Sequence, residues 1–132
     1  MTRTALVIDC DEKRLRLVCD ALVMFRPGFR VSTARDLQSA GDWLDTLSPD
    51  LVILDGSIAP ADMLGDWADQ HRLDATRTVI LGPASPAVKA LGAQSVPSPM
   101  ILPEFMETVR TIARRSDQTT VGPMATMKGS VR

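Results

Sequence analysis

Two aspartates stand directly after short apolar runs, a placement that carries chemistry in parallel β-sheets. Asp9 follows the run at residues 5–8, Asp55 follows the run at residues 51–54, and Asp11 lies just beyond Asp9. Because neighbouring parallel strands end at the same edge of a sheet, we expect these carboxylates to share one shallow pocket. Carboxylates that close repel one another unless a hard cation such as Mg²⁺ joins them. An aspartate in such a pocket can also attack a phosphoryl group as a nucleophile.

The elements that must position these carboxylates alternate along the chain. Short apolar runs predict strands, and apolar residues spaced three and four apart predict helices, with Val23 in the first helical stripe and Met63 in the third. Strand and helix alternate five times, which predicts an α/β fold: a doubly wound five-stranded parallel sheet with helices on both faces. The strands are expected at residues 5–8, 29–33, 51–54, 78–81 and 94–96, and the helical stripes at residues 15–23, 37–47, 63–71, 87–91 and 105–113.

Composition argues against several classes of function. The formal net charge is -1, with 15 basic and 16 acidic residues, so nothing favours binding to nucleic acid or to an anionic membrane. No apolar run reaches the roughly 18 residues that a membrane span needs. Only residues 1–4 precede the first strand, which leaves no room for a signal peptide. The two cysteines do not form a metal-ligand pattern, and we expect them to be reduced thiols in the cytoplasm.

Three segments carry a resemblance to a known family: LVIDCDEKRLRLV, PDLVILDGSIAP and LGAQSVPSPMILPEFMETVRTIARR. Through them the chain resembles, over residues 4–115, the response-regulator receiver domains, which are the CheY-like proteins of bacterial two-component signalling. The resemblance implies a flavodoxin-like (βα)5 receiver domain at residues 1–115 and a tail or linker at residues 116–132. It also implies that a histidine kinase would phosphorylate Asp55, and that Asp9, Asp55 and the carbonyl of Ser57 would bind Mg²⁺.

The sequence departs from the family pattern around this pocket. The family has two adjacent acids at the end of its first strand, and here Cys10 takes the second position. Cys10 could also be a redox thiol, an alternative that the acids around it disfavour. Asp11 is acidic, but successive side chains point in different directions, and it could instead open the first helix, where acids suit the helix dipole. The family's fourth strand ends in Thr or Ser, whereas Gly82 and Pro83 stand here without a hydroxyl.

The fifth strand departs further from the family. Its usual terminal Lys falls on Pro99, or on Ser98 if the alignment slides by one residue. The aromatic switch position of the same strand falls on Val96, and the chain contains no Tyr. Without the ammonium and the hydroxyl, a phosphoryl group on Asp55 would lose two partners that neutralise its charge. Because Cys10 stands in place of the second carboxylate, we also expect weak binding of Mg²⁺ at most.

These losses favour an atypical receiver-like domain, not an enzyme, that signals mainly by contact with another protein. Its partner would be a histidine kinase, a downstream signalling protein or a second copy of the chain. A working Mg²⁺-dependent phospho-acceptor at Asp55 is the first alternative, and a small flavodoxin-like enzyme or ligand binder is the second. Titration with beryllofluoride would separate the contact module from the phospho-acceptor, and a deep pocket at the strand ends would support the ligand binder.

Overall fold

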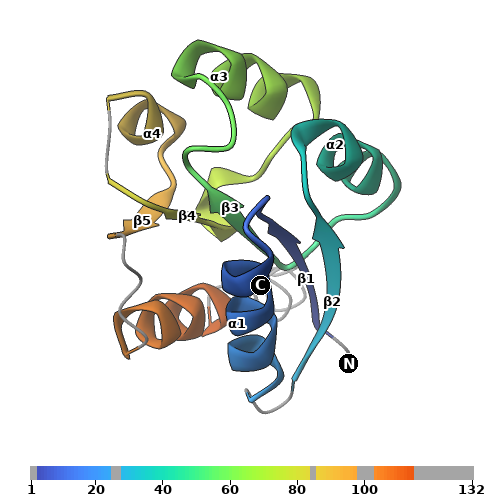
Figure 1. Cartoon of the computed structure of the whole chain (residues 1–132), viewed down its shortest axis with the longest axis vertical. Helices are drawn as coiled ribbons and strands as arrows, with labels where there is room; N and C mark the ends of the chain where they lie inside the picture. The colour runs from blue at the N-terminus through green and yellow to red at the C-terminus, as the bar shows by residue number, and fades with distance from the viewer. Residues whose placement is uncertain (1–2, 25–27, 84–85, 98–102, 115–132) are drawn as a thin grey trace, which may run out of the picture.

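The computed structural model describes residues 3–24, 28–83, 86–97 and 103–114, which form alternating strands and helices (Figure 1). No helix within these ranges is long and apolar enough to span a bilayer. The tail predicted at residues 116–132 lies outside them. A short 3-10 turn at Ala75–Arg77 precedes the fourth strand, and a last helix spans residues 103–114. The other elements are β1 (Arg3–Ile8), α1 (Glu12–Val23), β2 (Phe29–Ala34), α2 (Leu37–Thr46), β3 (Leu51–Asp55), α3 (Ala61–Gln70), β4 (Thr78–Leu81), α4 (Pro86–Leu91) and β5 (Gln94–Val96).

All five strands run parallel in one sheet, in the order β2-β1-β3-β4-β5. The chain leaves β1 towards one edge of the sheet and returns on the other side of β1 at β3. Such a reversal opens a crevice at the carboxyl ends of the two strands. The predicted doubly wound parallel sheet is confirmed, and its crevice lies where Asp9 follows β1 and Asp55 ends β3.

Helices cover both faces of the sheet, and the strand residues divide between two hydrophobic cores. Figure 1 shows α1 and the helix over residues 103–114 on one side of the sheet, with α2, α3 and α4 on the other. On β1, Val7 packs into the core under α1, while Leu6 and Ile8 pack into the opposite core. This alternation is the one that a pleated strand imposes. Every residue of β3 is buried, because both faces of this central strand are covered.

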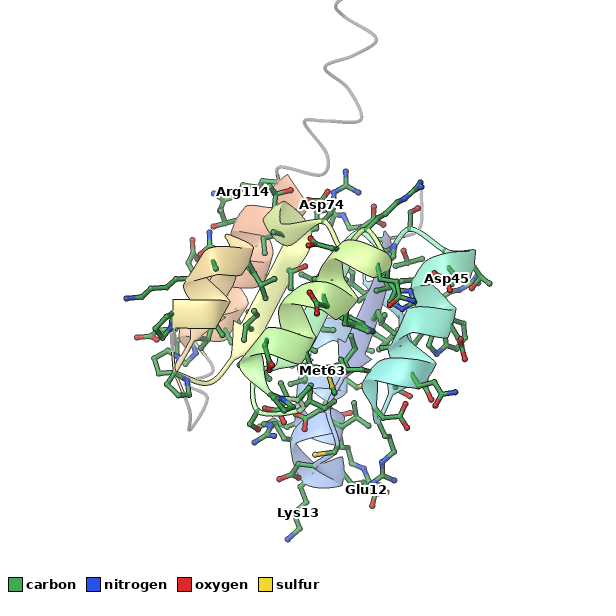
Figure 2. All side chains as sticks on the ribbon, turned by 90° about the horizontal axis from the view of Figure 1, so that it is seen from above. Glu12, Lys13, Asp45, Met63, Asp74 and Arg114 are labelled. Atoms are coloured by element: carbon green, nitrogen blue, oxygen red, sulfur yellow. The ribbon has the colours of Figure 1, made fainter. Side chains whose placement is uncertain are left out.

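The carboxyl and amino edges of the sheet face opposite ends of the molecule. Glu12 and Lys13 begin α1 directly after β1, and Asp74 precedes β4. Figure 2 shows Glu12 and Lys13 at one end of the molecule, with Asp74 and Arg114 at the other. Groups at the crevice are therefore separated from those at the amino edge by the length of the strands.

Two residues of the predicted helical stripes lie outside the cores. Val23 is 61% exposed and Met63 is 56% exposed, although each stands next to a fully buried leucine. An α-helix turns by about 100° at each residue. Val23, one residue after Leu22, and Met63, one residue before Leu64, are therefore turned away from the sheet. The buried faces of α1 and α3 are thus narrower than the apolar pattern predicts.

Candidate functional site

Asp9 and Asp55 lie side by side at the carboxyl edge of the sheet. Their strands are paired neighbours, with Ile8 opposite Leu54. Both aspartates are almost fully buried, at 1% and 4% exposed. An oxygen of each carboxylate and the sulfur of Cys10 lie within 4.8 Å of one another. The structure therefore brings together two of the acids singled out in the sequence, with the exposed Cys10 beside them.

A guanidinium lies between the two buried carboxylates. Arg14 donates from Nε to Asp9 Oδ2 at 2.5 Å and from Nη2 to Asp9 Oδ1 at 2.9 Å. The same Nη2 also donates to Asp55 Oδ2 at 2.9 Å. The planar fork of an arginine matches a carboxylate well, and such charge-assisted bonds are strong. The hydrogen bond from Arg14 to Asp9, together with the charges of Asp9 and Asp55, raises the pKa of Arg14.

Asp11 begins the helix that carries Arg14. Its backbone N–H donates to Asp9 Oδ1 at 2.9 Å, and its own Oδ1 accepts the backbone N–H groups of Lys13 and Arg14. Asp11 is thus the N-cap of α1. The backbone N–H of Arg14 is the main cause that lowers the pKa of the Asp11 carboxyl. The sequence left two positions open for Asp11, the acidic pocket and the start of the first helix. The structure shows the second: the side chain is exposed and does not join the buried pair of Asp9 and Asp55.

Ser57 completes the hydrogen bonds of Asp55. Its backbone N–H and its hydroxyl donate to Asp55 Oδ1 at 3.1 and 2.9 Å. Because Arg14 binds the other oxygen, both oxygens of Asp55 have donors, and so do both oxygens of Asp9. An unpaired buried charge would be costly, and this arrangement leaves neither carboxylate in that state. Arg14, Asp9, Asp55 and Ser57 therefore form a closed network.

The wall facing this network, at the ends of β4 and β5, carries no charged or hydroxyl side chain among the described residues. A cavity of about 170 Å³ beside Asp55 is lined there by Leu81, Gly82, Pro83 and Pro97. Gly82 has a φ of 128°, a backbone conformation that side chains rarely adopt. Serine or threonine at this position would strain the backbone. The local backbone therefore favours glycine here and disfavours a residue with a hydroxyl.

The other switch positions fall on both described and undescribed residues. Val96 lies on β5, is 2% exposed and packs in the core shared with the last helix. Its carbonyl accepts the backbone N–H of Gly82 at 2.8 Å. Ser98 and Pro99, on which the family's Lys position falls, lie outside the described residues.

Arg14 is not among the residues that the sequence pattern singled out. A signal for it does exist, because Arg14 precedes the buried residues Val18 and Ala21 by four and seven positions and so shares their face of the helix. Helical side chains lean towards the N-terminus, so a long side chain in the first turn reaches the strand ends. A charged residue on a buried stripe, one turn from an edge with acids, is the pattern that indicates such a bridge.

Comparison with solved structures identifies the fold. No protein-family model and no curated protein matches the sequence. The chain is similar to a CheY-like response regulator receiver domain protein from Methanospirillum hungatei, with a TM-score of 0.72 and 16% identity over 90% of this chain and 99% of that one. It is also similar to the receiver domain of the Francisella response regulator 1452, with a TM-score of 0.70 and 18% identity over 87% and 99% of the two chains. Full-length FixJ from B. japonicum matches with a TM-score of 0.71 and 20% identity, over 91% of this chain and 62% of that one. The chain therefore has the fold of the response-regulator receiver domains.

Proposed function

Given the receiver fold, we propose that this chain is a signalling domain that acts mainly by protein–protein contact, with degenerate phosphorylation machinery. The fold supports the signalling role, because the solved structures that share it are response regulators. The contacts of Asp55 are the observation that supports degenerate phosphorylation machinery. Its two carboxylate oxygens are already bound by Arg14 and Ser57, and the described residues of the wall across the cavity offer no donor side chain.

A phosphoryl group on Asp55 would add negative charge that the pocket has to neutralise. Gly82 and Pro83 offer no hydroxyl for this purpose, and the sequence has no lysine at residues 98–99. The single charge of Arg14 is already shared between two carboxylates. We therefore expect phosphorylation of Asp55 to be weak or absent.

The side chain at the switch position, Val96, also gives no support for a conformational signal passed from Asp55 to another face of the domain. Val96 is 2% exposed and packs in the same core as Phe105. A branched aliphatic side chain in a close-packed core has no polar group that could follow a phosphate, and its rotamer is restricted. The output is proposed to depend on a constant surface rather than on a conformational change at this position.

The surface of α1 is the contact face that this proposal favours. Of the five large apolar side chains that are exposed among the described residues, Leu17, Val23 and Met24 lie on α1 or at its C-terminal end. Leu17 and Met24 are seven residues apart, which places them on one side of the helix, and they are 49% and 70% exposed. Exposed apolar side chains that gather on one face of a helix are the kind of patch that contact surfaces use. The partner would be a histidine kinase, a downstream signalling protein or a second copy of the chain.

Titration with beryllofluoride in the presence of Mg²⁺ tests the proposal, because this compound mimics a phosphoryl group on an aspartate. We expect no saturable change in the amide NMR spectrum of the wild-type protein. Asp55→Ala is the direct control, and Asp50→Asn is the matched control, since Asp50 lies at the opposite end of the same strand. Saturable shifts that vanish in Asp55→Ala and persist in Asp50→Asn would overturn the proposal in favour of a working phospho-acceptor.

The alternative of a ligand-binding enzyme gains no support from the crevice. The cavity there has a volume of about 170 Å³, whereas small-molecule sites usually have volumes of about 300–1,000 Å³. A phosphoryl group would fit a space of this size, and a nucleotide or a flavin would not.

A further inference from the structure

The guanidinium of Arg14 lies in the gap between Asp9 and Asp55, where a cation that bridges the two acids would have to lie. Its Nη2 atom is 2.9 Å from an oxygen of each carboxylate. A single nitrogen atom therefore contacts both acids, as a bridging metal ion would. The two acids need such a cation, because they are 1% and 4% exposed and water does little to screen their repulsion.

The donor atoms left for a metal ion do not fit Mg²⁺, the ion that the receiver resemblance implies. Mg²⁺ requires near-octahedral oxygen ligands and usually binds one or two carboxylates together with water. All four carboxylate oxygens of Asp9 and Asp55 already accept hydrogen bonds. Among the described His, Cys, Asp and Glu side chains, the third one close to both acids is Cys10, whose sulfur is a soft donor that Mg²⁺ does not favour.

The fold fixes Arg14 in this place. Asp11 caps α1 and holds the backbone N–H of Arg14 at 3.2 Å, so the arginine stands in the first turn of the helix. From the first turn its side chain reaches the strand ends. A guanidinium does not lose its proton in a protein, so the cation is permanent, whereas a metal ion exchanges with solvent. A divalent ion that approached the two carboxylates would also meet the positive charge of this guanidinium.

We propose that Arg14 is a built-in cation that replaces the divalent metal ion of this pocket, holding Asp9 and Asp55 together and excluding Mg²⁺. The inference deepens the proposed function, because both concern the Asp55 pocket, but the two can fail separately. A pocket whose bridging cation is its own arginine stays in one state whatever the Mg²⁺ concentration. The domain would then present the same surface with and without the ion.

Paramagnetic broadening of amide resonances by Mn²⁺, a divalent probe for the Mg²⁺ position, tests the inference. In the wild-type chain we expect no selective, saturable broadening at Asp9, Cys10 or Asp55. In Arg14→Met these resonances should broaden selectively, with an apparent affinity at least about tenfold higher, because two carboxylates remain without a cation. Arg16→Met is the matched control: it removes the same charge from the same helix at a site that is 76% exposed, and it should behave as the wild type does. Selective broadening in the wild type that matches Arg14→Met within about twofold would overturn the inference.

A second measurement needs no variant, so it holds even if Arg14→Met does not fold. A metal ion that binds only the folded state raises the Tm. We expect 10 mM MgCl₂ to leave the Tm of the wild type equal to that in NaCl of the same ionic strength, and a selective rise with Mg²⁺ would overturn the inference. If Mn²⁺ binds the wild type while beryllofluoride does not, the inference fails and the proposed function stands. If acetyl phosphate phosphorylates Asp55 while Mn²⁺ does not bind, the proposed function fails and the inference stands.

Discussion

Two clusters, each of one arginine and two aspartates, lie at opposite edges of the sheet: the carboxyl-edge cluster of Arg14, Asp9 and Asp55, and the amino-edge cluster of Arg77, Asp50 and Asp74. The two arginine side chains are almost equally exposed, at 29% and 28%. The carboxylates differ, because those of the carboxyl-edge cluster are 1% and 5% exposed and those of the amino-edge cluster are 29% and 54% exposed. Identical residue types therefore meet two different environments.

The contacts differ in the same direction as the burial. The ion pairs of the carboxyl-edge cluster are 2.5 and 2.9 Å long. Those of the amino-edge cluster are 3.9 and 3.5 Å long, beyond the range of about 2.7–3.2 Å for a good hydrogen bond. Water can solvate an exposed carboxylate, so its pairing adds little stability. Two buried carboxylates have lost that water, and the arginine between them must offset the loss.

The largest expected difference between the clusters is in the free energy of unfolding that is lost when the arginine is removed. Arg14→Met leaves two buried carboxylates without a cation and should lower the free energy of unfolding by about 2–3 kcal/mol, slightly less than for a fully buried pair because the arginine is partly exposed. Arg77→Met should cost less than about 1 kcal/mol, since Asp50 also accepts the backbone N–H of Thr4 and Asp74 that of Thr76. Urea unfolding at pH 7 with EDTA measures both. Equal losses in the two variants would show that burial does not set the value of these pairs.

The sequence predicts the fold and two of the three residues of the carboxyl-edge cluster. The run at residues 78–81 matches the bounds of β4, because a strand that is buried along its whole length carries an uninterrupted signal. The weaker strand expected at residues 94–96 also matches β5, although only Val96 of its three residues is buried. Asp9 and Asp55 follow from the strand ends. Arg14 does not, because its role depends on the direction in which α1 crosses the sheet and on the reach of a long side chain. Both depend on tertiary packing, which the sequence pattern indicates only indirectly.

The pKa of the Asp11 carboxyl gives a smaller test of the same cluster. It lies below the ordinary value of 3.8, mainly because of the backbone N–H of Arg14 and to a lesser extent because of the guanidinium charge. The ionised cap therefore stabilises the fold above the ordinary pKa, and this stabilisation is lost as the pH falls through the lowered value. In Arg14→Met the backbone N–H remains, so we expect the pKa of Asp11 to rise only slightly and the acid unfolding of the variant to shift by a correspondingly small amount.

Carboxyl ¹³C NMR titration measures this pKa in both arginine variants. Asp36, whose pKa is lowered mainly by the backbone N–H of Ser39, serves as an internal reference that neither substitution touches. Arg77→Met should leave both values unchanged. A rise at Asp11 in Arg77→Met as large as in Arg14→Met would mean that general charge, and not the local bridge, sets the pKa.

The smallest expected difference between the two clusters is in how salt changes the stability that each arginine contributes. Exposed charges are screened within a distance of about 3 Å at 1 M ionic strength, whereas buried pairs are screened much less. The stability lost in Arg77→Met, about 0.5 kcal/mol at low salt, should therefore fall towards zero in 1 M NaCl. The loss in Arg14→Met should stay nearly constant, because its aspartate side chains are 1% and 5% exposed and bulk NaCl screens buried charges little. Urea unfolding at low and high salt measures both differences. A loss in Arg14→Met that fell with salt as steeply as that in Arg77→Met would place both clusters in contact with solvent, and the carboxyl-edge cluster would then have no need of a permanent cation.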